Sequence, residues 1–306
     1  MIRVRVPSFA KINWMLEVLG TRPDGYHEVR TVLQTIDLTD VLDVERTEGE
    51  IEVFCAHPEV PEGEANLVFR AAHLLRRAKG VKAGARIRIE KRIPVAAGLG
   101  GGSSNAAIAL LALARLWGVA LEVGEQLELG CALGSDVPFF LLGGTALGIG
   151  RGDEVYPLPE VRADLLVLAN PGFLIPTAWA YRQLTKRGIV GNISVCSRVW
   201  HRAVREGEPP SLSEIVGRNV FEEIVRERYP ELARGLDRMR ESGAVAVGLS
   251  GSGPTIFGVF ESEDPAIRAE VAFATLGWWR ARTRTVSRRQ YWERLSAALS
   301  NEASRP

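Results

Sequence analysis

The chain of 306 residues has little cysteine, no long apolar run and almost no net charge. Its three cysteines, Cys55, Cys131 and Cys196, are too widely spaced for a metal motif or a disulfide framework, which indicates a reducing cytoplasm. No apolar stretch approaches the roughly 18 residues of a membrane helix, and the N-terminus has no secretory signal pattern. The net charge of +1 gives no electrostatic reason to expect nucleic acid or a membrane as a partner. We therefore expect a cytoplasmic protein, and the sequence leaves both a monomer and a homodimer open.

The chain contains enough apolar material for two globular domains. Hydrophobic residues make up 46% and charged residues 25% of the sequence, an ordinary globular composition. The length suits two domains of about 150 residues each, and prolines in residues 157–164 mark a crossing between them. We predict an N-terminal domain over 1–160 and a C-terminal domain over 161–306. Because strands and helices alternate in both halves with hairpins between them, the predicted fold class is α+β and not a doubly wound parallel sheet.

Several elements can be predicted from local patterns. Alternating apolar residues predict separate strands at 29–36 and 41–46. Asp264, followed directly by a proline, predicts the N-cap of a helix. The arginine-rich segment after Trp278 has little pattern, and we expect a last strand at 283–286 and a loose helix after it.

The most informative stretch is the glycine-rich segment 94–107. It contains four glycines within five positions, followed by two serines. Glycine tolerates positive φ and has no Cβ, so this backbone can close tightly around an anion. One of the serines can cap a helix that runs to Trp117, and the free amides and dipole of a helix start favour a phosphate. We predict a nucleotide phosphate site formed by Pro94, Val95, Ala96, Ala97, Gly98, Leu99, Gly100, Gly101, Gly102, Ser103 and Ser104.

Two better-known phosphate loops do not fit this segment. A P-loop needs Gly-Lys-Ser/Thr, and the chain has no lysine between Lys91 and Lys186. The dinucleotide fingerprint needs a third Gly or Ala at the position of Ser103. The alternative without a ligand is an ordinary glycine turn between a strand and a helix, although consecutive glycines lose much conformational entropy on folding.

Three distant segments together resemble a known family. They are Ala10-Lys-Ile-Asn13 near the N-terminus, the glycine-rich segment, and Ser250-Gly-Ser-Gly-Pro-Thr255. In this order they resemble the motifs of the GHMP kinases, which include galactokinase and the homoserine, mevalonate and phosphomevalonate kinases. The resemblance covers nearly the whole chain. It implies an N-terminal domain like ribosomal protein S5 and a ferredoxin-like C-terminal domain.

A further motif narrows the resemblance. The segment Gly20-Thr-Arg-Pro-Asp-Gly-Tyr-His-Glu28 is similar to that of the GHMP kinases that act on cytidine-diphosphate-linked methylerythritol in the non-mevalonate isoprenoid pathway. The resemblance implies that ATP phosphorylates the 2-hydroxyl group of this small-molecule acceptor. ATP is then the co-substrate, and Mg²⁺ is expected from the nucleotide chemistry. No dedicated carboxylate cage is visible, so we expect ATP to hold the ion, with Ser104 as a further contact.

Phosphoryl transfer needs positioned phosphates and a group that receives the alcohol proton. The resemblance assigns the second role to Asp136 in the segment Gly134–Pro138, and it pairs this residue with Lys11. From the residues alone, Asp136 is more simply explained as a helix N-cap. Lys11 lies inside an apolar stretch, an unusual place for a charge without a function. A cation there would keep Asp136 ionised and stabilise charge on the transferred group.

The resemblance also implies how the two substrates are bound. Tyr26 and His27 follow a tight turn, so the tyrosine can stack on cytosine and the histidine can read its Watson–Crick edge, unless both are plain surface residues. Tyr181 would stack on the other face of the base or else only cover the core. Asn66 would contact adenine or act as a helix N-cap. The further acceptor contacts implied are Asn13, Thr177, Ser250, Gly251, Ser252 and Gly253, of which the last four could form only a hairpin turn.

Three alternatives stay open at this point. Another GHMP kinase, of the homoserine or mevalonate type, would share the motifs but would have no base to stack on Tyr26. A non-catalytic nucleotide-binding module would have lost the chemistry, and the retention of both Lys11 and Asp136 argues against it. A decarboxylase of the same fold would leave the turn before His27 unexplained.

Overall fold

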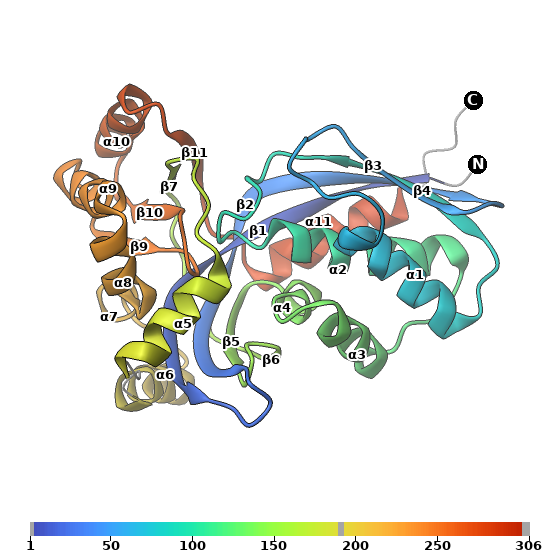
Figure 1. The fold of residues 1–306 in the computed structure, drawn as a ribbon, viewed down its shortest axis with the longest axis horizontal. Coiled ribbons are helices and arrows are strands. Elements are labelled where there is room, and N and C mark those ends of the chain that lie inside the picture. The colour runs from blue at the N-terminus through green and yellow to red at the C-terminus, as the bar shows by residue number, and fades with distance from the viewer. Residues whose placement is uncertain (1–2, 189–192, 302–306) are drawn as a thin grey trace.

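The computed structural model describes residues 3–188 and 193–301, with the backbone alone at 193–197. Two sheets, each covered by helices, lie side by side and form the two halves of the molecule (Figure 1), which confirms the α+β class. The larger sheet has the strand order β3-β4-β2-β1-β8, with β5 paired to β2 and β6 to β5. Its strands are β1 (Arg3–Thr21), β2 (His27–Thr47), β3 (Ile51–Cys55), β4 (Gly84–Glu90), β5 (Thr145–Ile149), β6 (Glu154–Pro157) and β8 (Arg218–Asn219).

The larger sheet is organised around β1 and β2, which pair antiparallel along almost their whole length. The predicted strands at 29–36 and 41–46 form one strand, because a shift in register and not a turn takes up the residues between them. A second shift leaves Trp14 without a partner on β2. This bulge reverses the alternation of side chains along β1, so that Lys11 and Leu16 line the same cavity.

Helix α2 lies at the centre of the larger core and is buried almost all round, as expected for a helix rich in Ala and Leu. The prediction that a serine caps this helix is wrong. The helix begins at Gly101, and its cap is Gly100 in the left-handed conformation, with φ of 69°, so Ser103 and Ser104 lie inside the first turn. The helices of this half are α1 (Leu67–Lys79), α2 (Gly101–Trp117), α3 (Val123–Leu133), α4 (Val137–Leu142) and α11 (Arg288–Ser300), and a short 3-10 turn (Gly63–Ala65) precedes α1.

The smaller sheet is antiparallel throughout, in the order β11-β7-β10-β9. Helix α10 begins at Glu263 after Ser262, so Asp264 is not its N-cap. The last strand lies at Trp279–Thr283, earlier than the predicted 283–286. The strands are β7 (Leu166–Asn170), β9 (Ala246–Leu249), β10 (Ile256–Val259) and β11, and the helices are α5 (Thr177–Arg187), α6 (Ile193–Glu206), α7 (Leu212–Ile215), α8 (Phe221–Arg228), α9 (Pro230–Glu241) and α10 (Glu263–Thr275).

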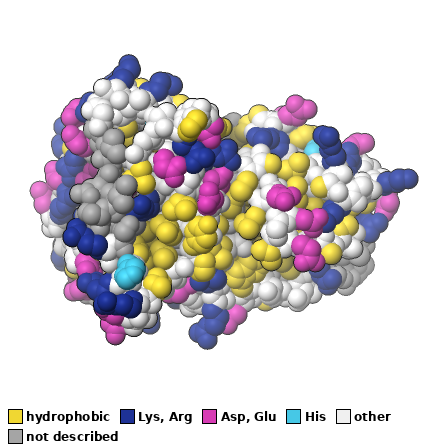
Figure 2. Space-filling model, turned by 90° about the horizontal axis from the view of Figure 1, so that it is seen from below, with side chains coloured by type: hydrophobic (Ala, Val, Ile, Leu, Met, Phe, Trp, Pro, Cys, Tyr) yellow, Lys and Arg dark blue, Asp and Glu magenta, His cyan; other side chains and the backbone are white. Residues whose placement is uncertain are grey.

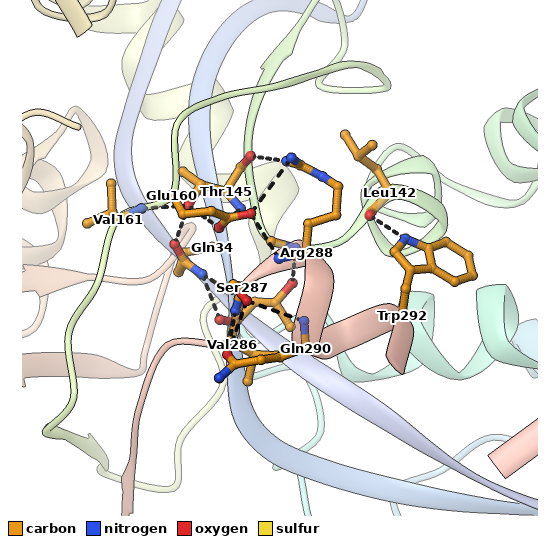
Figure 3. Close-up of polar contacts among 12 residues, drawn as sticks. Gln34, Leu142, Thr145, Glu160, Val161, Val286, Ser287, Arg288, Gln290 and Trp292 are labelled. Atoms are coloured by element: carbon orange, nitrogen blue, oxygen red, sulfur yellow. Dashed lines mark hydrogen bonds and ion pairs between the residues drawn. The ribbon is translucent and has the colours of Figure 1, made fainter. Parts of the chain in front are cut away.

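The C-terminal helix returns to the larger sheet (Figure 3). Helix α11 buries Tyr291 in the larger core, so it is a packed element and not the loose helix expected from the sequence. At its start, Glu160 accepts hydrogen bonds from the Arg288 amide at 2.8 Å and from the Thr145 amide at 3.1 Å. The end of the predicted C-terminal domain, 161–306, therefore packs on the N-terminal half.

Cys55 and Cys131 are free thiols, whereas the side chain of Cys196 lies outside the described residues. Within the described ranges, no helix combines the length and the apolar character needed to cross a bilayer. Seen from below, hydrophobic side chains gather over the middle of the molecule and charged side chains lie mostly around them (Figure 2).

Candidate active site

The glycine-rich segment forms one wall of a cavity of about 280 Å³. Helix α1 and the loop before it, at Val60 and Pro61, form the opposite wall. The structure therefore places most of the predicted nucleotide residues around one space large enough to hold a ligand. The predicted residues that line it are Asn66, Pro94, Val95, Ala96, Ala97, Gly98, Gly100, Gly101, Gly102 and Ser103, whereas Leu99 and Ser104 do not.

Two of the glycines are needed for close approach. A Cβ on Gly98 would lie 2.2 Å from the Ser250 carbonyl oxygen, and a Cβ on Gly100 would lie 2.8 Å from the Phe140 ring. Both glycines have positive φ, as does Ala96 at 49°. No side chain caps the start of α2, so its first amides are free of side-chain partners. These amides and the helix dipole make this end of the cavity suitable for an anion.

Ser104 does not reach the cavity. Its hydroxyl is fully buried and accepts a hydrogen bond of 2.7 Å from Ser8, which also contacts Asn105 at the same distance. The expected contact from Ser104 to a metal ion is therefore not supported by this arrangement. Asn66 is the N-cap of α1, because its side-chain oxygen accepts from the Val68 amide at 2.8 Å. Its contact with adenine stays a prediction, at a position on the cavity wall.

A buried ion pair that was not predicted from the sequence supports the glycine-rich segment. The Lys91 ammonium lies 2.7 Å from the Asp40 carboxylate, and both side chains are almost fully buried. The same carboxylate accepts hydrogen bonds from the amides of Arg92 at 2.7 Å and Ile93 at 2.8 Å. Asp40 therefore fixes the chain where β4 leads into the segment. Only the register of β2 against β4 brings these residues together, so no local pattern could have found them.

Lys11 and Asp136 meet between the two halves of the molecule. The Lys11 ammonium lies 3.8 Å from an Asp136 carboxylate oxygen, and it donates a hydrogen bond of 2.7 Å to Asn13. Burial lowers the pKa of Lys11, and the neighbouring carboxylate opposes that shift. Asp136 stands at the start of α4 but makes no capping hydrogen bond with its side chain, which is 41% exposed. The carboxylate is thus free for another role than capping.

This pair stands in a second cavity of about 150 Å³. Thr31 also lines this cavity and was not predicted from the sequence. Its hydroxyl accepts a hydrogen bond from the Asn13 amide at 2.7 Å and donates one to the Met15 carbonyl at 2.8 Å. This chain of hydrogen bonds fixes the amide that holds Lys11. The predicted residues on the walls are Lys11, Asn13, Gly98, Asp136, Thr177, Tyr181, Gly251 and Ser252, and the walls also include Leu16, Val29, Thr31, Arg151, Gly152 and Phe221.

The loop 250–253 closes the second half of the molecule onto the glycine-rich segment. Ser250 donates a hydrogen bond of 2.9 Å to the Gly98 carbonyl, and its own side chain does not line the second cavity. Ser252 and Thr177 share a hydrogen bond of 3.1 Å at the cavity. Asn219, also missed from the sequence, donates to the Gly251 carbonyl at 2.8 Å. The loop is therefore more than a hairpin turn, because it contacts both the segment and the second cavity.

The predicted base-binding residues are only partly brought together. His27 stacks on Tyr181, with ring centroids 4.7 Å apart, and its Nε2 atom lies 2.8 Å from the Thr185 hydroxyl. Burial lowers the pKa of His27, which favours the neutral ring, and burial with the Asp136 charge raises the pKa of Tyr181. Tyr26 stands apart on the turn, is 55% exposed, and lies under the Arg151 guanidinium. Tyr181 thus lines the second cavity between His27 and Phe221, whereas Tyr26 does not line it and touches it only through Arg151.

Comparisons with known proteins agree with this geometry. Residues 66–144 match the family model of the GHMP kinases N terminal domain, and residues 200–277 match that of the GHMP kinases C terminal. A 4-diphosphocytidyl-2-C-methyl-D-erythritol kinase from Pelotomaculum thermopropionicum is 44% identical over 254 residues, which cover 82% of this chain and 86% of the relative.

Solved structures give the same result. The crystal structure of a 4-(cytidine 5'-diphospho)-2C-methyl-D-erythritol kinase is 36% identical with a TM-score of 0.75, over 92% of this chain and 100% of that one. A homoserine kinase from Cytophaga hutchinsonii shares the fold at 18% identity, with a TM-score of 0.65 over 93% of this chain and 95% of its own. The chain belongs to the GHMP kinases and, within them, to the family of 4-diphosphocytidyl-2-C-methyl-D-erythritol kinases.

Proposed function

We propose that the protein transfers the terminal phosphate of ATP to the 2-hydroxyl group of 4-diphosphocytidyl-2-C-methyl-D-erythritol, giving the 2-phosphate and ADP. The observation that carries the proposal is the Lys11–Asp136 pair at 3.8 Å, in a cavity that shares Gly98 with the nucleotide cavity. A phosphate held at the start of α2 would thus face an acceptor held beside Asp136. The step belongs to isoprenoid precursor synthesis, and we expect it in the cytoplasm.

The residues of this chain can perform each part of the transfer. The free amides at the start of α2 bind and orient the phosphate oxygens. Asp136 receives the proton of the acceptor hydroxyl as the oxygen attacks. Lys11 stabilises the negative charge that spreads over the transferred group, and its contact with Asn13 keeps the ammonium in place. The contact of the loop 250–253 with Gly98 would exclude water from the space between the substrates.

The described residues contain no cluster of three or more His, Cys, Asp or Glu side chains that could hold a metal ion. The side chains of the described residues therefore fit a metal ion that the nucleotide binds rather than one held by protein ligands alone. We therefore propose that Mg²⁺ is bound by the ATP phosphates. When bound, it would neutralise charge on the phosphate oxygens.

The cytidine end of the acceptor separates this proposal from the other GHMP kinases. Homoserine and mevalonate have no base, so they would give Tyr26, His27 and Tyr181 no nucleobase to bind. Tyr181, on which His27 stacks, lines the second cavity, which suits a base that continues into the acceptor. We propose that Tyr26 and Tyr181 stack on cytosine and that the neutral His27 ring reads its edge.

A coupled assay that follows ADP release tests the proposal. We expect turnover with 4-diphosphocytidyl-2-C-methyl-D-erythritol and none with methylerythritol phosphate, which lacks the cytidine. Homoserine and mevalonate serve as further acceptors in the same assay. Preferred turnover of either one would overturn the substrate assignment, and ATP binding without turnover of any alcohol would favour a non-catalytic module.

A further inference from the structure

Arg151 is a cation in the wall of the second cavity that the proposed chemistry does not use. It stands at the tip of the β5–β6 hairpin between Gly150 and Gly152, which both have positive φ, at 67° and 93°. Such a turn is open to glycine and strained for other residues, so the hairpin presents this one side chain at a defined place. Among the described residues that line this cavity, Lys11 and Arg151 are the only cations.

The Arg151 guanidinium is held in place before any substrate arrives. Asp153 contacts its Nε atom at 2.9 Å and its Nη2 atom at 2.5 Å. The guanidinium carbon lies 5.1 Å from the centre of the Tyr26 ring, within the range of a cation–π contact. The hydrogen bonds to Asp153, together with its charge, raise the pKa of Arg151, so the group stays cationic. Asp153 engages only part of the five N–H donors of the guanidinium, and a side chain already held in place loses little entropy when its other donors bind an anion.

Arg151 connects the two ends of the acceptor site. One end is the turn with Tyr26, which the guanidinium touches directly. The other end is Asp136, which shares the wall of the cavity with Arg151. An acceptor with cytosine at the first end and its hydroxyl at the second must place its diphosphate between them. That diphosphate is the strongest negative charge of the acceptor and needs a cationic partner.

Lys11 stands at the hydroxyl end, beside Asn13 and Asp136, where the proposed mechanism assigns its charge to the transferred phosphate. Resting on the proposed function, we infer that Arg151 binds the diphosphate of the cytidine-linked acceptor. It thereby sets the specificity for a nucleoside diphosphate over a bare nucleoside. Arg151 is a specificity residue in this scheme, since it contacts a part of the substrate that does not react.

The test measures binding of cytidine, CMP and CDP by calorimetry, so it does not depend on turnover. The wild-type protein should bind CDP more tightly than cytidine. In Arg151→Gln we expect the preference for CDP over cytidine to fall about tenfold to a hundredfold, the usual effect of losing a charged hydrogen bond. Affinity for cytidine should fall less than affinity for CDP, because Arg151 meets the cytosine end only through Tyr26. Arg151→Lys keeps the charge but loses the fork, so it should retain part of the preference.

Arg162→Gln is the matched control. Arg162 has the same spacing to its carboxylate partner, with Nε 2.9 Å from Asp164, but its side chain is 83% exposed and lines neither cavity. This variant should bind all three ligands like the wild type. If Arg151→Gln weakens cytidine and CDP equally, or changes neither, Arg151 does not bind the diphosphate. If the wild type neither binds cytidine nucleotides nor turns over the acceptor, the proposed function itself fails.

Discussion

The Lys11 ammonium lies 3.8 Å from the Asp136 carboxylate, and the two groups differ sharply in exposure, at 4% and 41% of their side chains. The lysine is buried because β1 runs through the core, whereas the aspartate stands at the exposed start of a short helix. Burial lowers the pKa of the Lys11 ammonium, and the charge and hydrogen bond of Asp136 oppose that shift.

Replacing the proposed base should stop turnover and leave binding intact. Asp136→Asn keeps the size and polarity of the side chain but removes the proton acceptor, so we expect kcat to fall by about 10²–10⁴-fold. Because the side chain makes no capping hydrogen bond, the fold should be unaffected. Rapid-quench or coupled assays measure kcat, and Asp164→Asn, at an exposed site, is the control. Near-normal turnover in Asp136→Asn would remove it as the base.

The pH dependence of turnover should report on Lys11. Burial lowers the pKa of this ammonium, so it loses its proton at a lower pH than an exposed lysine would. Activity should therefore decline on the alkaline side, at a pH below the usual pKa of lysine. Lys11→Arg, which stays charged, should be slower overall but should move this decline to higher pH. An alkaline limb that is identical in both proteins would show that another group causes it. The measurement is kcat against pH for each.

The sequence predicted residues that the structure places around the two cavities, but not the residues that hold them in place. Gly98, the glycines at 100–102, Lys11 and Asp136 could be predicted from local composition and from the resemblance, and their roles stay predictions. Thr31 and Asp40 could not, since their partners are fixed only by the register of β2 with its neighbours. The burial of the Ser104 hydroxyl could not be predicted from the sequence either, because it depends on the residue at which α2 begins.

Removing the exposed tyrosine of the turn should weaken the cytidine substrate alone. Stacking on an aromatic ring contributes about 1–3 kcal/mol per base, so Tyr26→Ala should raise KM for the acceptor by about fivefold to 150-fold. KM for ATP should stay nearly constant. Tyr156→Ala is a matched control, because Tyr156 is exposed to a similar degree, 51%, on β6 and lines neither cavity. A change confined to KM for ATP would contradict the assignment of Tyr26 to the base.

A methyl group at Gly98 should disturb the contact between the two halves of the molecule. The new Cβ would lie 2.2 Å from the Ser250 carbonyl oxygen, and φ at this position is +79°. Crowding and the left-handed backbone together should destabilise Gly98→Ala by about 2–5 kcal/mol. Gly102→Ala is the control, since its Cβ would meet only Leu67 at 3.8 Å. There, alanine in a helix should be neutral or stabilising by about 0.5–1 kcal/mol. Equal unfolding temperatures for both variants would refute the close contact.

Glu17 should make the fold more stable in acid than at neutral pH. Its side chain is buried on β1, and within the described part of the chain its Oε2 atom has no hydrogen-bond partner. Burial raises the pKa of Glu17, and the charges of Arg30 and Arg218 oppose this only in part. A carboxyl with a raised pKa in the folded state favours folding when protonated. This stabilisation by Glu17 is complete at pH values below the pKa of the group in the unfolded chain. It is lost as the pH rises through the pKa of Glu17 in the folded protein.

The variant Glu17→Gln removes this titration while keeping the shape of the side chain. At pH 7 it should be more stable than the wild type, on the order of 1 kcal/mol, because no buried charge remains without a full set of partners. The difference should shrink as the pH is lowered toward 4 and the wild-type carboxyl takes up its proton. Glu48→Gln, at a site where the side chain is 89% exposed, should change stability by less than about 0.5 kcal/mol. Denaturant unfolding at both pH values measures the effect, and a variant less stable at pH 7 than the wild type would show that the ion pairing of Glu17 outweighs its burial.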